Sequence, residues 1–135
     1  GLPVSPTGFE VEVEGPQAVR LPDGGVLEFK LVGVAKLEPV YNGRRSVVAA
    51  ARMRFPLLVR NWRAGDRFQP AGSRSRKKLK TLFQQERIPV AERARLPLAV
   101  CGDEIVWVAR LGVAAGYELT PGSTEALVIE EKQQP

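Results

Sequence analysis

The sequence contains no histidine and only one cysteine, Cys101, among its 135 residues. Without histidine, the chain lacks the side chain that proteins use most often as a general base and as a metal ligand. One cysteine alone cannot build a zinc site of the usual Cys/His type, and it cannot form a disulfide within the chain. Nucleophilic catalysis of the Ser–His or Cys–His kind is excluded because the chain has no histidine.

Nucleotide-binding motifs and long apolar runs are missing as well. Neither GxxxxGK[ST] nor GxGxxG occurs, so no phosphate-binding loop is indicated. We therefore expect no catalytic residue, no metal site and no cofactor in this chain. No apolar run approaches the ~20 residues of a membrane-spanning helix. Together with the single cysteine, this predicts a cytoplasmic protein without membrane contact. The first residue is glycine, which suggests a fragment or a processed chain.

Positive charge is abundant and unevenly distributed. The whole chain has 20 Lys and Arg against 15 Asp and Glu, a net charge of +5. Residues 60–95 hold eleven of the cations and only three of the acids, so this segment carries +8 and the remainder −3. A basic segment on a mildly acidic scaffold attracts polyanions, of which nucleic acid is the most common.

Alternation of apolar and polar residues predicts several β-strands. In GFEVEVEG, Phe9, Val11 and Val13 alternate with glutamates, which is the period of a half-buried strand. Turn signals at LPDGG, Asn42-Gly43, Gly102-Asp103 and Pro121-Gly122 separate such segments. Residues 47–53 leave strand and helix both open. The other expected strands are a ribbon through residue 38 that includes 26–31, a strand within 55–62, a hairpin of 97–101 with 104–110, and a last strand at 125–131.

One short helix is expected over about residues 76–87. Leu79, Leu82 and Phe83 have the i, i+3, i+4 spacing of one helical face, and Pro89 prevents continuation. The predicted fold class is therefore α+β, with mostly antiparallel strands and one conspicuous basic helix.

The expected start of this helix is unusual because it places Arg76, Lys77 and Lys78 in the first turn. Cations at this end oppose the helix dipole, at a cost of ~0.3–1 kcal/mol each. The arrangement makes sense if a phosphate docks there, where free backbone N–H groups and the dipole favour an anion. The alternative is a solvated charged face without a specific ligand.

The preceding loop, NWRAGDRF, adds two arginines. Arg63 and Arg67 flank a Gly-Asp turn, and guanidinium groups bind phosphate oxygens in a bidentate manner. Asp66 is interpreted as a turn former or an arginine partner rather than a catalytic acid. Trp62 and Phe68 could stack on bases or belong to the core.

A longer string, PLLVRNWRAGDRFQPAG…KKLKTLFQQERIPVAERARLPLAV…DEIVWVARLGVAAGYELT, resembles the C-terminal domain of bacterial tRNA(Ile)-lysidine synthetase. The resemblance covers about residues 55–120. Ser75, Ala50 and Arg110 depart from the family pattern, which often has Gly, Asp and Gly there. The matching positions are Gly65, Asp66, Arg67 and Phe68 of GDRF; Lys77, Lys78 and Leu79 of the KKL helix start; and Ile88, Pro89, Glu92 and Arg93 of the IP…ER stretch.

The resemblance implies a role in tRNA modification. The parent enzyme uses ATP, with Mg²⁺, and lysine to convert the wobble cytidine of tRNA(Ile) to lysidine. Its N-terminal catalytic domain carries an SGGxDS-type loop, and its C-terminal domains grip the acceptor stem of the tRNA. We therefore divide the chain into a β-rich leading subdomain (1–54), the synthetase-like domain (55–131) and a tail (132–135).

The sequence thus predicts a non-catalytic domain that binds the phosphate backbone of a tRNA acceptor stem. Expected partners are tRNA and the N-terminal catalytic domain of the same chain, and a homo-oligomer is possible. The alternative is a protein-interaction or dimerisation module with a basic face; a complete small enzyme is disfavoured by the missing motifs. The expected RNA-binding residues are Arg63, Arg67, Arg74, Arg76, Lys77, Lys78, Lys80, Arg87 and Arg93.

Overall fold

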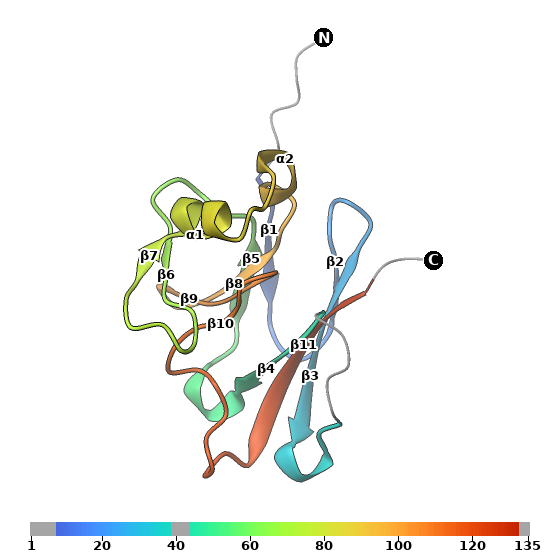
Figure 1. Ribbon diagram of the computed structural model, residues 1–135. Helices are drawn as coiled ribbons and strands as arrows, with labels where there is room; N and C mark the ends of the chain where they lie inside the picture. The colour runs from blue at the N-terminus through green and yellow to red at the C-terminus, as the bar shows by residue number, and fades with distance from the viewer. Residues whose placement is uncertain (1–7, 39–43, 133–135) are drawn as a thin grey trace.

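The computed structural model describes residues 8–38 and 44–132. Within these ranges, every pair of strands is antiparallel and the α-helices are two short ones, so the predicted α+β class is confirmed. Two sheets form two layers, and a small hairpin with both helices lies at one side and end (Figure 1).

The first sheet has the strand order β1-β5-β8-β9-β10. Its first strand pairs Val11 with Val59 and Val13 with Leu57, so the alternating segment near the N-terminus lines up with the strand expected within 55–62. The predicted Gly102-Asp103 turn joins β8 to β9, and Gly102 has a φ of 61° there. The strands of this sheet are β1 (Glu10–Val13), β5 (Leu57–Arg60), β8 (Leu98–Cys101), β9 (Glu104–Val108) and β10 (Gly112–Val113).

The second sheet has the order β2-β3-β11-β4. The last strand, β11, lies in its interior and pairs over its whole length with β3 and over five residues with β4. The strands are β2 (Ala18–Arg20), β3 (Val26–Gly33), β4 (Arg45–Ala49) and β11 (Glu125–Lys132). Two 3-10 turns follow β3 and β4, η1 (Val34–Lys36) and η2 (Ala50–Arg52).

Strand pairing connects the two parts of the chain on either side of residue 54. In the first sheet β1 pairs with β5, and in the second sheet β11 pairs with β3 and β4. Both layers therefore combine an early strand with a later one. The division into segments 1–54, 55–131 and 132–135 stays a prediction about the organisation of the parent protein.

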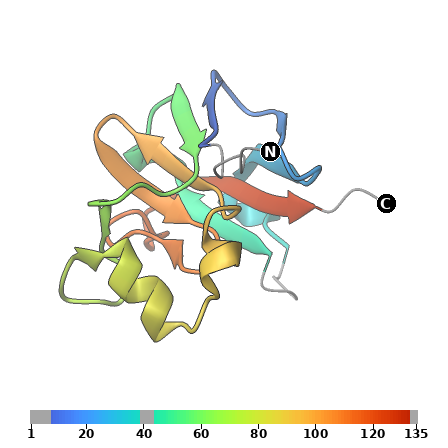
Figure 2. The same cartoon turned by 90° about the horizontal axis from the view of Figure 1, so that it is seen from above.

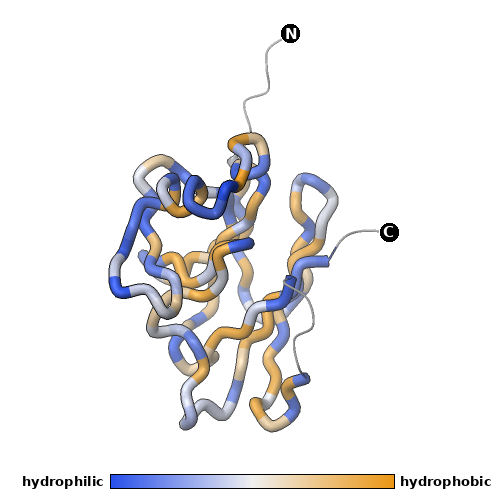
Figure 3. Tube along the Cα trace, in the orientation of Figure 1, coloured by the Kyte–Doolittle hydropathy of each residue, from blue (hydrophilic) through white to orange (hydrophobic). Residues whose placement is uncertain are grey.

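The core fills the space between the layers. Leu27 and Phe29 of β3 and Ile129 of β11 are fully buried and face the first sheet. Trp107 of β9 is also buried, and its Nε1–H donates to the hydroxyl of Ser46 on β4 at 2.9 Å, which ties the layers together. The view from above shows the layers crossing (Figure 2), and the apolar segments line the space between them (Figure 3).

Most strand predictions are confirmed, with local differences. The ribbon after residue 26 ends as a strand at Gly33, and Leu31 is 43% exposed although it alternates with buried Leu27 and Phe29. The ambiguous segment 47–53 divides into the end of β4 and the turn η2. The predicted Asn42-Gly43 turn lies outside the described residues. The short elements β2, β6 (Arg67–Phe68), β7 (Lys77–Lys78), β10 and α2 (Val90–Arg93) were not individually predicted.

Candidate nucleic-acid interface

The basic segment forms a hairpin beside the first sheet. Strands β6 (Arg67–Phe68) and β7 (Lys77–Lys78) pair with each other. The loop between them lies alongside β10 and the residues after it. The backbone N–H of Ala115 donates to the carbonyl of Gln69, and that of Ala71 donates to the carbonyl of Val113, both at 2.8 Å. These bonds fix the base of the loop on the sheet.

Helix α1 (Leu79–Gln85) anchors the hairpin on the core. Leu79, Leu82 and Phe83 are buried, as the helical spacing predicts. Trp62 packs edge-on against Phe83 with ring centroids 5.5 Å apart. The helix ends at Gln85 with Glu86 at the C-cap, and Arg87 then adopts a left-handed conformation with a φ of 56°.

The predicted helix boundaries are wrong at both ends. The helix covers 79–85 rather than 76–87, so Arg76, Lys77 and Lys78 precede it. Lys78 occupies the N-cap position with extended backbone and belongs to β7. The helical spacing begins only at Leu79, and nothing in the cation run itself favours a helix. The expectation that Arg76, Lys77 and Lys78 occupy the first turn of the helix is therefore incorrect, and Lys80 is the one cation of this run that lies within α1.

The hairpin instead places like charges opposite each other. Arg67 is the direct cross-strand partner of Lys78, and Phe68 is the partner of Lys77. Directly opposite residues share one face of a β-ladder, and like charges there are destabilising. The electrostatic cost that the sequence suggests at a helix terminus is thus found at a strand pair.

Asp66 organises the loop in front of this hairpin. Its carboxylate accepts two hydrogen bonds from the Arg60 guanidinium, at 2.9 and 3.0 Å, and one from the backbone N–H of Arg63 at 2.7 Å. Its backbone carbonyl accepts the N–H of Leu79 at 2.9 Å. Asp66 is thus both the turn former and the arginine partner that the sequence suggests.

Arg60 is a structural residue that the sequence analysis did not single out. The side chains of Arg60 and Asp66 are only 9% and 13% exposed, so their ion pair is largely shielded from water. A signal was present, because an arginine at the end of an apolar strand followed by a Gly-Asp turn is a candidate for such a pair.

The nine predicted RNA-binding residues fall into three groups. Arg63 pairs with Glu10, and Arg76 lies 3.5 Å from Glu104. Arg93 is buried: its Nε–H donates to the carbonyl of Ile88 at 2.8 Å, and its guanidinium lies over the Phe83 ring. The other six have no carboxylate within 4.0 Å in the described part of the chain; they are Arg67, Arg74, Lys77, Lys78, Lys80 and Arg87.

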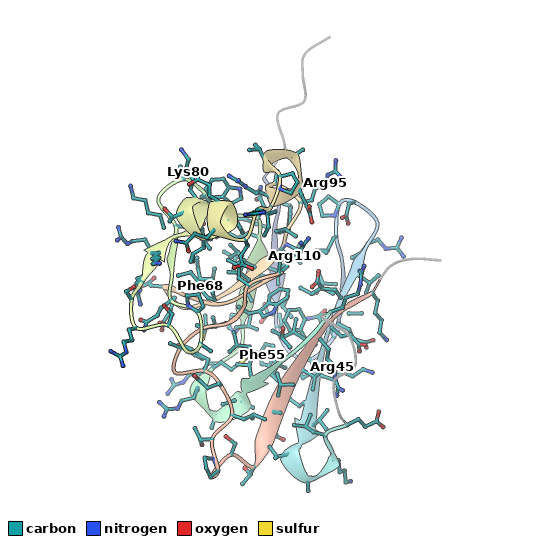
Figure 4. The ribbon with its side chains drawn as sticks, viewed as in Figure 1. Arg45, Phe55, Phe68, Lys80, Arg95 and Arg110 are labelled. Carbon is teal, nitrogen blue, oxygen red and sulfur yellow. The ribbon has the colours of Figure 1, made fainter. Side chains whose placement is uncertain are left out.

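We call the exposed or half-buried cations of the hairpin and of α1 that have no carboxylate partner among the described residues the basic hairpin surface: Arg67, Arg74, Lys77, Lys78 and Lys80. The hydrophilic residues of β7 and of the loop before it are coloured blue in Figure 3. The side chain of Lys80 points away from the body of the protein in Figure 4. Phe68 is 1% exposed and belongs to the core, so it is not available for base stacking.

Two other kinds of site are absent from the described residues. Within residues 8–38 and 44–132, no three His, Cys, Asp or Glu side chains are grouped so that they could hold a metal ion. No helix in the same ranges is long and apolar enough to cross a membrane. Arg110, where the resemblance expects glycine, has a φ of 74° and pairs with Glu92 of α2.

The chain belongs to the class of small two-layer antiparallel domains, and its basic hairpin, residues 67–80, contains no Asp or Glu. Comparison with known proteins identifies the family. Residues 57–130 match the family described as "TilS substrate C-terminal domain". The chain belongs to this family, the C-terminal substrate-binding domain of tRNA(Ile)-lysidine synthase.

Individual relatives agree with this assignment. The tRNA(Ile)-lysidine synthase of Solibacter usitatus is 45% identical over 92 residues, which are 68% of this chain and 21% of that protein. The enzyme of Geobacter sulfurreducens is 30% identical over 127 residues, which are 92% of this chain and 26% of that protein. A crystal structure of a TilS C-terminal domain superimposes with a TM-score of 0.79 at 27% identity, covering 96% of this chain and 99% of that one. The chain thus spans about a fifth to a quarter of these curated relatives.

Proposed function

We propose that this chain is a tRNA-binding domain of a tRNA(Ile)-lysidine synthase and that it binds the phosphate backbone of the acceptor stem through the basic hairpin surface. The observation that carries the proposal is the concentration of cations without carboxylate partners on β6, β7, their loop and α1. In addition, Arg67 lies directly opposite Lys78, an arrangement that folding alone disfavours. A phosphate between these two side chains would turn the repulsion into attraction.

Backbone contact fits the chemistry of this surface better than base reading. Lysine and arginine supply charge to phosphate oxygens, and these contacts position a protein without carrying sequence information. A-form RNA hides its major groove, so a short hairpin meets phosphates and 2′-hydroxyl groups across the shallow minor groove. A surface of this kind is suited to the body of a stem.

The remaining predicted residues have different roles in this proposal. Arg63 and Arg76 are more than half exposed, and such surface ion pairs are weak, so both side chains can exchange a carboxylate for a phosphate. Arg87 extends the surface beyond α1. Arg93 is excluded from RNA contact because it is buried and holds the turn at Ile88.

The chemistry of the parent enzyme lies, in this proposal, outside the residues of this chain. ATP and Mg²⁺ would be used by the N-terminal catalytic domain of the same protein, which is then the intramolecular partner of this domain. A tRNA-modifying enzyme of this kind would act in the cytoplasm. The contribution of the present domain is to hold the correct tRNA while another domain acts on it.

Salt-dependent tRNA binding tests the proposal. We would measure the affinity of tRNA(Ile) for the chain and for Lys77→Ala/Lys78→Ala at several salt concentrations. Each lost phosphate contact lowers the slope of log affinity against log salt by ~0.7–0.9, so the double variant should bind more weakly with a slope reduced by up to ~2. Lys30→Ala/Lys36→Ala removes the same charge from the second sheet and its η1 turn and should have a much smaller effect.

Three results would count against the proposal. If both double variants weaken binding equally, the attraction depends on net charge rather than on the hairpin. If the Lys77/Lys78 variant is folded and binds like the parent chain, the basic hairpin surface is merely solvated. A chain that ignores RNA and self-associates through this surface would support the protein-interaction alternative.

A further inference from the structure

A cavity of about 290 Å³ lies between the basic hairpin and the first sheet. Its apolar lining includes Phe68 of β6, Val100 of β8 and Ile105 of β9, while Arg67, Arg76 and Glu104 contribute charge. Small-molecule sites combine apolar walls with a few polar groups and usually measure ~300–1,000 Å³. This cavity is at the lower end of that range, which suits one nucleoside-sized group rather than a larger ligand.

The charges in this cavity are balanced, unlike those of the surface around it. Arg60 and Asp66 neutralise each other, and Arg67 and Arg76 are matched by Asp103 and Glu104. A second phosphate would be attracted by the arginines and repelled by the carboxylates. A group that offers hydrogen-bond donors on one edge and acceptors on another fits this composition better.

Glu104 is held in place from two sides. Its Oε1 accepts the hydroxyl of Tyr117 at 2.8 Å, and its Oε2 lies 3.5 Å from the Arg76 guanidinium. Burial, followed by the hydrogen bond to Glu104, raises the pKa of Tyr117 to about 12, so its hydroxyl remains a donor at neutral pH. Each carboxylate oxygen has two lone pairs, so Glu104 can still accept a hydrogen bond from a ligand.

We propose that this cavity binds one unstacked cytosine of a single-stranded part of an RNA, with its N4 amino group donating to Glu104 and Asp103. Carboxylates are the usual acceptors for cytosine N4. Arg76 and Arg67, which also line the cavity, donate to the cytosine carbonyl. The inference rests on the proposed function, because it adds one base-reading site to a surface that otherwise contacts backbone.

Uracil provides a matched control ligand, because it replaces the N4 amino group with a carbonyl oxygen that would face the carboxylates. We would titrate the chain with cytidine 5′-monophosphate and uridine 5′-monophosphate and follow backbone amide signals by NMR. Cytidine monophosphate should shift the amides around residues 102–104 and 114–115. It should bind at least about fivefold more tightly than the uridine compound, since one such pairing discriminates by ~1–3 kcal/mol.

Glu104→Gln tests the assignment of the carboxylate. The amide can donate to uracil, so the preference for cytidine monophosphate should disappear, while affinity for a duplex stem should not fall. Lys77→Ala/Lys78→Ala should do the reverse and weaken duplex binding without changing the preference. Should Glu104→Gln fail to fold, Asp103→Asn, in the exposed turn, should also reduce the preference.

Equal affinities for the two nucleotides, or signal changes confined to the basic hairpin surface, would overturn the cytosine site. Such a result leaves duplex binding by the hairpin intact, so the two proposals fail separately.

Discussion

Exposed lysines have opposite charged neighbours in the second sheet and in the basic hairpin surface. On the sheet, the Oε1 atom of Glu28 lies 3.1 Å from the Nζ atom of Lys30 and 3.0 Å from that of Lys132, so two lysines share one carboxylate. On the hairpin, Lys78 lies opposite Arg67 and has no carboxylate within 4.0 Å among the described residues. Both regions are antiparallel ladders, so the difference lies in which charges lie next to each other.

This contrast indicates which charges serve the fold. Lys30 and Lys132 of the sheet share a carboxylate partner within the chain, whereas Arg67 and Lys78 of the hairpin lie opposite each other and would gain from a bound anion. Four experiments test this contrast, in order of decreasing expected effect.

The largest effect should come from the apolar support of the hairpin. Phe83→Ala removes a fully buried ring that contacts Trp62 and should lower the free energy of unfolding by ~3–5 kcal/mol. Val90→Ala, at a position that is 74% exposed, is the matched control and should change little. Chemical denaturation measures both. An unchanged stability of Phe83→Ala would mean that α1 does not anchor the hairpin.

A somewhat smaller effect should follow from Asp66→Asn. This change leaves the buried Arg60 guanidinium without its carboxylate and should destabilise the protein by about 3 kcal/mol. The exposed pair between Arg63 and Glu10 offers the control, since Glu10→Gln should cost less than ~1 kcal/mol. Equal costs for the two variants in thermal or chemical unfolding would contradict the structural role of Asp66.

Removing a hairpin charge should stabilise the fold slightly. Lys78→Gln eliminates the repulsion with Arg67 and should raise the free energy of unfolding by ~0.2–1 kcal/mol, while RNA binding becomes weaker. The gain should shrink at high salt because exposed charges are screened. Lys36→Gln is the control without a cross-strand cation. A loss of stability in Lys78→Gln would show that the hairpin charges support the fold after all.

The smallest effect concerns pH. Hydrogen bonds from Lys132 and then Lys30 lower the pKa of Glu28 below its usual value of 4.5. The folded state therefore gains stability from Glu28 above that value and loses it as the pH falls through the lowered pKa. Glu28→Gln should show a smaller loss of stability between about pH 6 and about pH 3. If the stability of the parent chain and of Glu28→Gln falls equally with decreasing pH, Glu28 does not contribute to the acid sensitivity of the fold.

Local patterns in the sequence explain much of this fold. Alternation places β1 and β3, and the i, i+3, i+4 spacing identifies the buried face of α1. The start of α1 is not predictable in the same way, because a run of cations has no apolar period and Lys78 takes part in a strand pair. The central position of β11 depends on contacts with residues about eighty to a hundred positions earlier, which local periodicity does not record.

The candidate site is predictable as a composition but not as a geometry. Counting charge finds the segment 60–95, yet it cannot separate the exposed Lys78 from the buried Arg93 or from the paired Arg60. Burial depends on which strand each arginine follows and on which ring or carboxylate the fold brings near it. The cavity beside Glu104 is lined by residues of the hairpin and by residues of β8 and β9 that lie far from it in the sequence, so no single stretch of sequence reveals it.

The position of β11 also has a consequence for synthesis on the ribosome. Strands β3 and β4 leave the ribosome about eighty to a hundred residues before the strand that lies between them. Until residues 125–132 emerge, both expose backbone groups and apolar side chains that are later covered. A nascent chain stalled before this point would offer unpaired strand edges to its neighbours, which is a typical route to aggregation. A premature stop codon near residue 124 should therefore produce insoluble protein rather than a slightly shortened domain.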